Sequence, residues 1–323
     1  MGCAGLKPIP LRVYHLTFTL DQPALATAMV VDSEGNEVAV LWSNKAVSAG
    51  VLKVDWDGRD KDGKDVAPGS YRVLVSPIRY DLKPLGNFGG QGATPGRFLN
   101  PEGLCAYPQG ARLTVAVADT GNNRVQLLTD QGGFLQSAGD FGSGEEALNH
   151  PTDVDWDGQI LTVCDSQNHR LALFDGKGSF LSQVVKLTGL QTSLGGAPPV
   201  LDFQDPQCLR HDAGAFWVSD AGHGILFHVT NTGGVLDEIG AKFPLANDGP
   251  FLPVGGDFWV KTGRAQVQIV DSNGNVLDEV KADPPFKNVS GFAASAQNFN
   301  LISDTDNGLL YLVDNNGRVF ESL

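Results

Sequence analysis

The sequence has few cysteines, no long apolar run and no CxxC pair. Of its four cysteines, Cys105, Cys164 and Cys208 lie inside runs of β-type residues, and we interpret these three as small buried thiols rather than as a disulfide or a metal site. No stretch of eighteen apolar residues occurs. The sequence therefore offers no candidate for a membrane-spanning helix.

Basic side chains are also scarce. Lys and Arg number 23 against 37 Asp and Glu, which gives a net charge of −14. Residues 1–80 contain nine side chains of each sign, so the whole excess belongs to residues 81–323. Such a negative field repels phosphate backbones and anionic lipid. We therefore predict that the chain does not bind nucleic acid.

Short runs of alternating apolar and polar residues, separated by tight turns, make up the N-terminal quarter. The turns contain Gly35 and the pair Pro68-Gly69, residue types that supply the backbone angles of β-turns. The predicted strands cover residues 16–20, 26–31, 38–42, 51–56 and 71–75. This pattern predicts a small antiparallel β-sandwich over residues 13–79.

Five aspartates between Asp55 and Asp65 form a pattern that suits a hard cation such as Ca²⁺. A calcium loop of the EF-hand type that begins at Asp55 needs an acid at its twelfth place, where Val66 stands. Two Asp-Gly turns beside a half-buried Trp56 explain the aspartates better. Calcium remains the alternative here.

The segment 54–71 contains Trp56-Asp57-Gly58, then Asp62-Gly63, then Gly69-Ser70-Tyr71. In order and spacing these elements resemble the Ig-like domain of the flagellar hook-capping protein family (FlgD type). The resemblance covers about the first quarter of the chain. It implies a structural and assembly module that is attached to secreted or surface proteins, and it implies no catalytic residue.

The rest of the chain repeats one pattern five times. Each copy has a first strand, a second strand that ends in a polar residue, a third strand, an Asx- and Gly-rich hairpin and a fourth strand. The five first strands start near Pro101, Pro151, Pro206, Pro250 and Val289. A four-stranded unit cannot cover both of its faces, so such units stack around an axis. The sequence is thus all-β and predicts a β-propeller over residues 80–323, with five blades favoured and six as the alternative.

The first two copies share an Asp-x-x-Asn-x-Arg motif, at residues 119–124 and 165–170, and each follows a Phe-Gly pair and a proline. These motifs resemble NHL repeats. Proteins of the NHL-repeat family are commonly six-bladed propellers. The third copy keeps Asp220 but has His223-Gly224-Ile225 in place of Asn-x-Arg. We interpret the motif as structural: the Asp accepts amides of its own turn, the Asn adopts the left-handed conformation and the Arg bridges to carboxylates.

The loops that connect blades, at residues 86–100, 140–150, 187–205, 240–250 and 281–288, share one end of such a propeller with the connections between second and third strands. Loops on a rigid scaffold are where recognition usually occurs. We therefore predict that this end binds a protein or a glycan, through Glu102, Arg124, Thr152, His169, Arg170, Gln207, His223 and Asn307.

Two enzyme classes provide the alternative. NHL-like propellers include peptide-amidating lyases, in which a His follows the proline of several blades and holds zinc; here those places are Glu102, Thr152, Gln207 and Phe251. These residues cannot form a zinc triad. The Pro101-Glu102-Gly103 element is faintly similar to calcium-dependent lactonases. We predict no catalytic residue, metal or cofactor, and keep a Ca- or Zn-dependent hydrolase or lyase with an axial site as the alternative.

Residues 1–12 form a leader with Cys3 in Gly2-Cys3-Ala4-Gly5. This start resembles that of a mature bacterial lipoprotein, which implies a lipid on Cys3 and a possible membrane tether. An ordinary disordered N-terminus is the alternative. We therefore predict a non-enzymatic binding or scaffold protein, either periplasmic, anchored to the outer membrane or at the cell surface.

Overall fold

The computed structural model describes residues 13–21, 23–78, 88–189, 201–240, 245–295 and 299–323. The leader with Cys3, the predicted domain boundary at residue 80 and the Gly- and Pro-rich residues 194–199 lie outside this set. The chain separates into two compact units. The first comprises Met1–Leu82, Ser295–Leu301 and Leu309–Leu323, and the second comprises Lys83–Ala294 and Ile302–Gly308.

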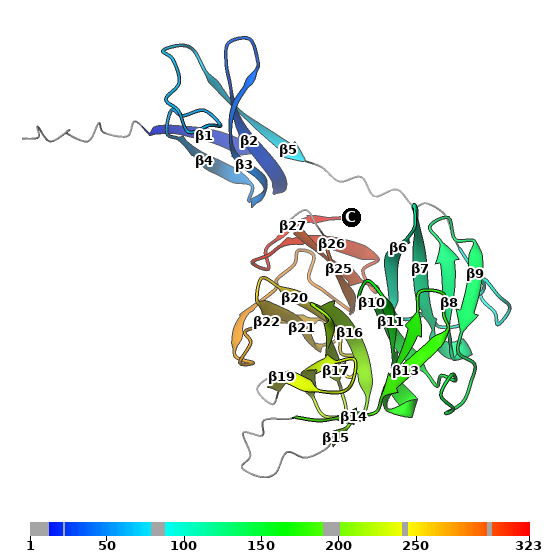
Figure 1. Ribbon diagram of the computed structural model, residues 1–323. Coiled ribbons are helices and arrows are strands. Elements are labelled where there is room, and N and C mark those ends of the chain that lie inside the picture. The colour runs from blue at the N-terminus through cyan, green and yellow to red at the C-terminus, as the bar shows by residue number, and fades with distance from the viewer. Residues whose placement is uncertain (1–12, 22, 79–87, 190–200, 241–244, 296–298) are drawn as a thin grey trace, which may run out of the picture. The chain divides into compact units, whose positions relative to one another are not determined.

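Five strands near the N-terminus form the predicted sandwich (Figure 1). They are β1 (Tyr14–Leu20), β2 (Ala24–Val31), β3 (Glu37–Val47), β4 (Gly50–Trp56) and β5 (Arg72–Ile78). One sheet has the order β1-β4 and the other has the order β3-β2-β5. All pairs are antiparallel, with Leu16 opposite Val54 and Val30 opposite Val73. The sandwich thus has two strands in one layer and three in the other.

Trp56 lies in the core of this sandwich, in a cluster with Val30 and Ala39. Only 6% of its surface is exposed, so the expectation of a half-buried indole is wrong. Its Nε1 donates a hydrogen bond to the carbonyl of Arg59 at 2.8 Å. Asp60 accepts the N–H groups of Asp62 and Lys64, each at 2.9 Å. The aspartate-rich segment is therefore built as turns that close over the indole.

Five antiparallel four-stranded sheets follow, each with its strands in sequence order. The first holds β6 (Leu104–Gln109), β7 (Arg112–Asp119), β8 (Arg124–Thr129) and β9 (Phe134–Ala138), and the second holds β10 (Pro151–Trp156), β11 (Ile160–Asp165), β12 (Arg170–Asp175) and β13 (Phe180–Val184). The third holds β16 (Pro206–Asp212), β17 (Ala215–Asp220), β18 (Ile225–Thr230) and β19 (Val235–Gly240). The fourth holds β20 (Phe251–Val254), β21 (Asp257–Gly263), β22 (Gln266–Val270) and β23 (Val276–Glu279), and the fifth holds β24 (Val289–Ala294), β25 (Phe299–Asp304), β26 (Leu309–Asp314) and β27 (Val319–Ser322).

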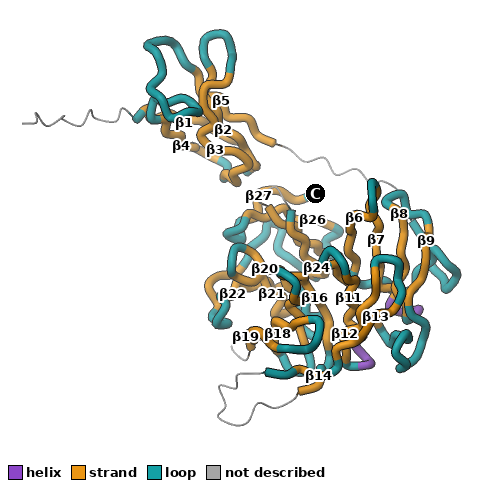
Figure 2. Tube along the Cα trace, in the orientation of Figure 1, coloured by secondary structure: helices purple, strands orange, loops and turns teal. Residues whose placement is uncertain are grey.

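Short elements lie between and within these sheets. The pair β14 (Lys186–Leu187) and β15 (Leu201–Asp202) follows the second sheet. Two single 3-10 turns, η1 (Thr120–Asn122) and η2 (Ser166–Asn168), join second to third strands and are purple in Figure 2.

The first strands of successive sheets, β6, β10, β16, β20 and β24, contact one another in that order. Hydrophobic clusters fill the space between neighbouring sheets. One joins Val125 and Leu127 of the first sheet to Leu161 and Phe174 of the second, and two more join the second sheet to the third and the third to the fourth. This is the packing of a β-propeller. The predicted all-β fold is confirmed, and the described residues contain five four-stranded sheets.

Candidate functional site

The second strand of four sheets ends in a buried aspartate: Asp119, Asp165, Asp220 and Asp304. In the first two sheets the strand register places this aspartate opposite an arginine, with Asp119 facing Arg124 and Asp165 facing Arg170. Antiparallel pairing thereby brings the Asp and the Arg of each motif together at one end of the sheet.

In the first sheet the Asp119 carboxylate accepts hydrogen bonds from four residues. The Arg124 Nε lies 2.8 Å away, the backbone N–H of Leu99 2.7 Å, and the side-chain amides of Asn122 and Gln126 2.8–3.0 Å. Such charge-assisted bonds are stronger than neutral ones. Because Leu99 belongs to the loop before β6, the carboxylate ties that loop to the end of the second strand.

The second sheet repeats this arrangement. Asp165 accepts the backbone N–H of Asn149 at 2.7 Å and the Arg170 Nε at 2.7 Å. Arg170 also donates through Nη2 to the carbonyls of Gly144 at 2.8 Å and Ala147 at 2.6 Å. As expected, each Asp accepts an amide of its own turn, the side-chain amide of Asn122 or Asn168. The backbone N–H donors, however, belong to the loop before the first strand.

The left-handed residue of the turn also differs from the expectation. Asn123 and His169, with φ of 55° and 54°, adopt this conformation. The motif residues Asn122 and Asn168 instead lie inside the 3-10 turns. Their side-chain amides donate to the aspartate and to the preceding loop, with the Asn168 Nδ2 2.9 Å from the Gly142 carbonyl.

The third and fifth sheets keep the aspartate without the arginine. Asp220 accepts the backbone N–H groups of Gln204 and Asp205 at 2.8 and 2.9 Å, and His223 Nδ1 lies 3.0 Å from it. Asp304 accepts the backbone N–H groups of Lys287 and Asn288, and the Nδ2 of Asn307 donates to it at 2.8 Å. In all four sheets the carboxylate fixes the same loop.

Burial and hydrogen bonding oppose each other at these carboxylates. Burial raises the pKa of Asp165 above its ordinary value, although the N–H of Asn149 and the side chains of Asn168 and Arg170 favour the charged form. At Asp304 burial also raises the pKa, but hydrogen bonds from the backbone N–H groups of Lys287 and Asn288 lower it by more. The pKa of Asp304 is therefore lowered.

Two further predicted residues form a bridge between sheets. Thr152 is buried, and its Oγ1 donates to the carbonyl of Gln207 at 2.8 Å. The side-chain amide of Gln207 donates to Asp205 at 2.6 Å and lies 3.2 Å from the Ser166 hydroxyl. These contacts connect the starts of the first strands in the second and third sheets.

The eight predicted site residues thus lie at the end of the second unit where first strands begin and second strands end. Arg124, Arg170, Thr152, His223 and Asn307 hold the backbone of this end together, and Gln207 is half-buried. Glu102 and His169 are exposed, although the His169 imidazole also bonds to the Gln204 carbonyl. Loss of hydration around its carboxylate raises the pKa of Glu102 even though the residue keeps contact with solvent; nearby Asp248 and Asp153 raise it further, whereas His150 lowers it.

Phe141 was missed by sequence reasoning. It lies in the loop between the first and second sheets, and 74% of its surface is exposed. The sequence pattern marks the Phe-Gly pair only as a repeat signature. No signal in the sequence separates it from Phe88, which begins the other Phe-Gly pair, before the first sheet, but lies against Gly132.

A polar cluster between the second and third sheets was also missed. Asp153 accepts the Arg210 Nη1 at 2.7 Å and the Leu209 N–H at 3.0 Å, and Asp155 accepts the His211 N–H at 2.7 Å. Burial raises the pKa of Asp155 and of the thiols of Cys105, Cys164 and Cys208, so these thiols stay protonated. The charged groups of this cluster join the second sheet to the third.

Among the residues that the structure describes, no three His, Cys, Asp or Glu side chains are grouped so that they could hold a metal ion. Within the same residues no helix has the length and apolar character needed to span a bilayer.

The fold defines a protein with an Ig-like sandwich and a β-propeller. Residues 13–79 match the family described as FlgD Ig-like domain, which confirms the expectation for this segment. The chain is 29% identical over 97 residues to the protein brain tumor of Drosophila melanogaster, a match that covers 29% of this chain and 9% of that protein. The chain thus spans less than a tenth of the length of this relative.

Several solved structures share the backbone arrangement in part. A streptogramin B lyase has a TM-score of 0.49 and 12% identity, with 96% of this chain and 86% of that chain covered. A catalytically inactive virginiamycin B lyase from Staphylococcus aureus with quinupristin has a TM-score of 0.48 and 10% identity, and the match covers 96% of this chain and 88% of that chain. The WD40 β-propeller domain of Doa1 has a TM-score of 0.47 and 13% identity, and the match covers 72% of this chain and 70% of that chain. These identities are too low to relate any activity to this chain.

Proposed function

We propose that this protein is a non-enzymatic binding or scaffold protein of the cell envelope or the extracellular space, and that the loop end of its propeller binds a protein or glycan partner. The exposed ring of Phe141 carries this proposal. Among the described residues Phe141 is the most exposed large apolar side chain, and aromatic side chains are enriched at protein interfaces relative to the rest of the surface.

The loop behind Phe141 is held in place before any partner arrives. Its carbonyls at Gly142 and Gly144 accept bonds from Asn168 and Arg170, and its N–H at Asn149 donates to Asp165. Fixing the backbone in advance lowers the entropy lost on binding. The motif that the sequence repeats therefore serves recognition by holding a loop, while exposed residues such as Phe141, Glu102 and His169 supply the contacts.

The proposal is tested by placing a photo-crosslinking phenylalanine analogue at Phe141 in the full chain within its source cells. The matched control places the same analogue at Leu113, which is 48% exposed at the start of β7, at the opposite end of the first sheet. We expect a crosslinked protein, or binding to a glycan array that Phe141→Ser abolishes. The proposal fails if position 141 gives neither, or if both positions give the same products.

We further propose an extracytoplasmic location, with a membrane tether through a lipid on Cys3. The FlgD-type match supports an assembly module of secreted or surface proteins. The test is labelling of cells with a radioactive fatty acid, followed by fractionation. We expect label and membrane association for the parent chain and loss of both for Cys3→Ser. Equal fractionation of parent and variant would exclude the tether and leave the binding proposal standing.

A further inference from the structure

The Ig-like sandwich is open along one side. Among the described residues, β1 pairs only with β4 and β5 pairs only with β2, so both strands are edges. The inward-facing residues of these edges, Leu16 and Phe18 of β1 and Val73 of β5, are only half-buried, whereas Val30 of the central strand is fully buried. Core-facing side chains on this side therefore lack a covering layer.

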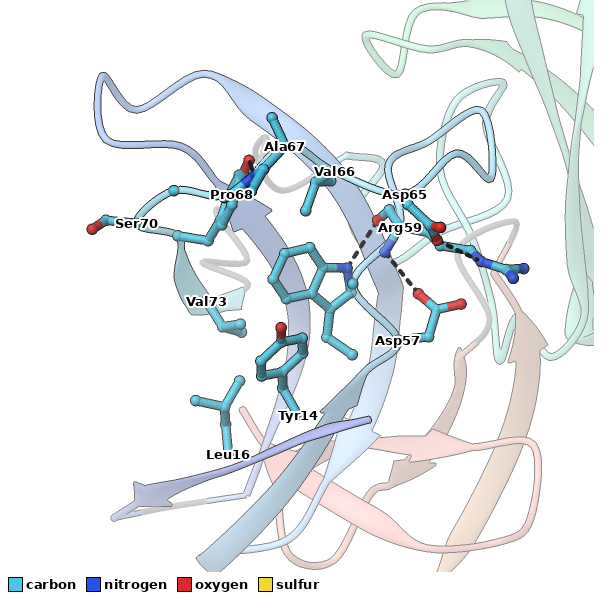
Figure 3. Close-up of a pocket in the computed structure, with 14 residues that line it drawn as sticks. Tyr14, Leu16, Asp57, Arg59, Asp65, Val66, Ala67, Pro68, Ser70 and Val73 are labelled. Carbon is cyan, nitrogen blue, oxygen red and sulfur yellow. Dashed lines mark hydrogen bonds and ion pairs between the residues drawn. The ribbon is translucent and has the colours of Figure 1, made fainter. Parts of the chain in front are cut away.

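A groove of about 1030 Å³ lies at this open side (Figure 3). It is lined by Tyr14 and Leu16 of β1, Trp56 at the end of β4, Tyr71 just before β5 and Val73 of β5. The rings of Tyr14 and Tyr71 lie 5.5 and 5.3 Å from the Trp56 ring. This volume is at the upper limit of small-molecule sites, which measure about 300–1,000 Å³.

One end of the groove carries charge. Asp57, Arg59 and Asp65 line it, and Arg59 Nε lies 3.5 Å from the Asp65 carboxylate. Asp57 accepts the backbone N–H of Arg59 at 3.1 Å, and no ion pair neutralises it among the described residues. In Figure 3 these three side chains lie on the same side of the groove, away from Ser70 and Val73. The end therefore keeps one net negative charge, which favours a cationic group on the occupant.

We infer that this groove binds an extended polypeptide segment of another protein, which adds a strand at the edge of β1. The segment has apolar side chains at alternate positions, because successive side chains of a strand point to opposite faces, and a Lys or Arg at the end that meets Asp57. Main-chain hydrogen bonds to a free strand edge give such complexes their affinity, and pockets for alternate side chains give specificity. This inference is independent of the proposed role of the propeller end.

The test uses the full chain and a fluorescent peptide of about seven residues, the length of β1, in which Val and Thr alternate and one end carries a Lys. Fluorescence anisotropy measures binding. We expect saturable binding that Val73→Arg weakens by about tenfold or more, because it places a charge in the groove. Leu74→Arg is the matched control, since Leu74 is the next residue of β5 and points to the other face; we expect a change of less than about twofold there.

Two further measurements keep the test decisive if Val73→Arg does not fold. A peptide with N-methyl groups at alternate residues cannot complete the strand ladder, and we expect it not to bind. Exchanging the terminal Lys for Glu should weaken binding to the parent chain but not to Asp57→Asn, which keeps the packing. The inference is overturned by absent binding, by equal binding of the N-methylated peptide, by competition from an oligosaccharide such as maltoheptaose, or by a dimer of the chain that Val73→Arg disrupts.

Discussion

Arg170 illustrates how a single residue can organise a loop at the propeller end. Its guanidinium is almost fully buried, pairs with Asp165 and reaches the Gly144 and Ala147 carbonyls. The five donors of a guanidinium have fixed directions, and a lysine cannot match them. The sequence motif therefore predicts a fixed loop as well as an ion pair.

We expect Arg170→Met to destabilise the propeller by about 3–5 kcal/mol, because it leaves the Asp165 carboxylate buried without its cation. The exposed Arg112 provides the control, and Arg112→Met should change the free energy of unfolding by less than about 0.5 kcal/mol. Urea denaturation followed by tryptophan fluorescence measures both. Equal stability of the two variants would show that the ion pair contributes nothing to the fold.

Asp304 gives a prediction about pH. Its folded pKa lies below the ordinary value of 3.8 because backbone N–H groups stabilise the carboxylate, so its contribution to stability is complete above pH 3.8 and is lost as the pH falls through the folded pKa. We expect Asp304→Asn to lose about 2 kcal/mol at pH 7. The difference in stability between Asp304→Asn and the parent chain, measured by thermal unfolding, should become smaller below pH 3.8.

The exposed Asp278 is a suitable control for this pH experiment, because the N–H of its neighbour Glu279, at 2.8 Å, is the only donor to its carboxylate among the described residues. Asp278→Asn should follow the parent curve at every pH. A gap for Asp304→Asn that stays constant down to about pH 3 would contradict the proposed stabilisation of the carboxylate.

At the scale of the element, the fourth sheet differs from the others because a lysine stands near the end of its second strand, where the other sheets have an aspartate. Lys261 pairs with Pro250 in the position that the aspartates hold elsewhere, is buried, and bonds to the carboxylate of Asp248 in the preceding loop. The same link between loop and second strand is thus made with the cation on the strand and the anion on the loop.

This inversion predicts strong coupling between the two residues. Asp248→Asn should destabilise the protein by about 1–2 kcal/mol, less than for a fully buried pair because Asp248 is exposed on one side. The same change in a Lys261→Met background should have almost no effect, because the buried cation is then gone. A double-mutant cycle by urea denaturation measures the difference. Additive effects would refute the coupling.

Close approach of the first two sheets depends on Gly103. A Cβ there would lie 2.5 Å from the Cα of Asp153 and 2.8 Å from the carbonyl of Thr152. Backbone atoms cannot move aside as a flexible side chain can, so the strands β6 and β10 would separate.

We expect Gly103→Ala to lower the free energy of unfolding by about 1–3 kcal/mol. Gly144→Ala is the control, because a Cβ at that residue would have no other atom within 4 Å and its φ is not positive; it should be neutral or stabilise by up to about 1 kcal/mol. Differential scanning calorimetry compares the two variants. An unchanged melting temperature for Gly103→Ala would mean that the sheets repack at no cost.

For the whole molecule, the repeat pattern was sufficient to predict five sheets, and the alternating runs with their turns were sufficient to predict the sandwich. Strand alternation and Gly-rich turns are local properties of the sequence. The repeat pattern did not show where side chains point. Arg124 and Arg170 were expected on an open binding face, yet their register opposite Asp119 and Asp165 turns them into the loop network. That direction depends on contacts between loops distant in sequence, and so does the open side of the sandwich between β1 and β5.

The uneven charge of the chain leads to the last prediction. Residues 1–80 are balanced, whereas the rest carries the full −14, so repulsion among carboxylates opposes compaction of the propeller alone. Raising NaCl from about 0.01 to 0.15 M shortens the Debye length from about 30 to 8 Å. The melting temperature of the propeller should therefore rise with salt, while that of the sandwich should stay constant. Neutralising the exposed pair with Glu145→Gln and Glu146→Gln should reduce the salt increment. A melting temperature that falls with salt would instead mean that pairs such as Arg170 with Asp165 dominate the electrostatics, because screening then removes more attraction than repulsion.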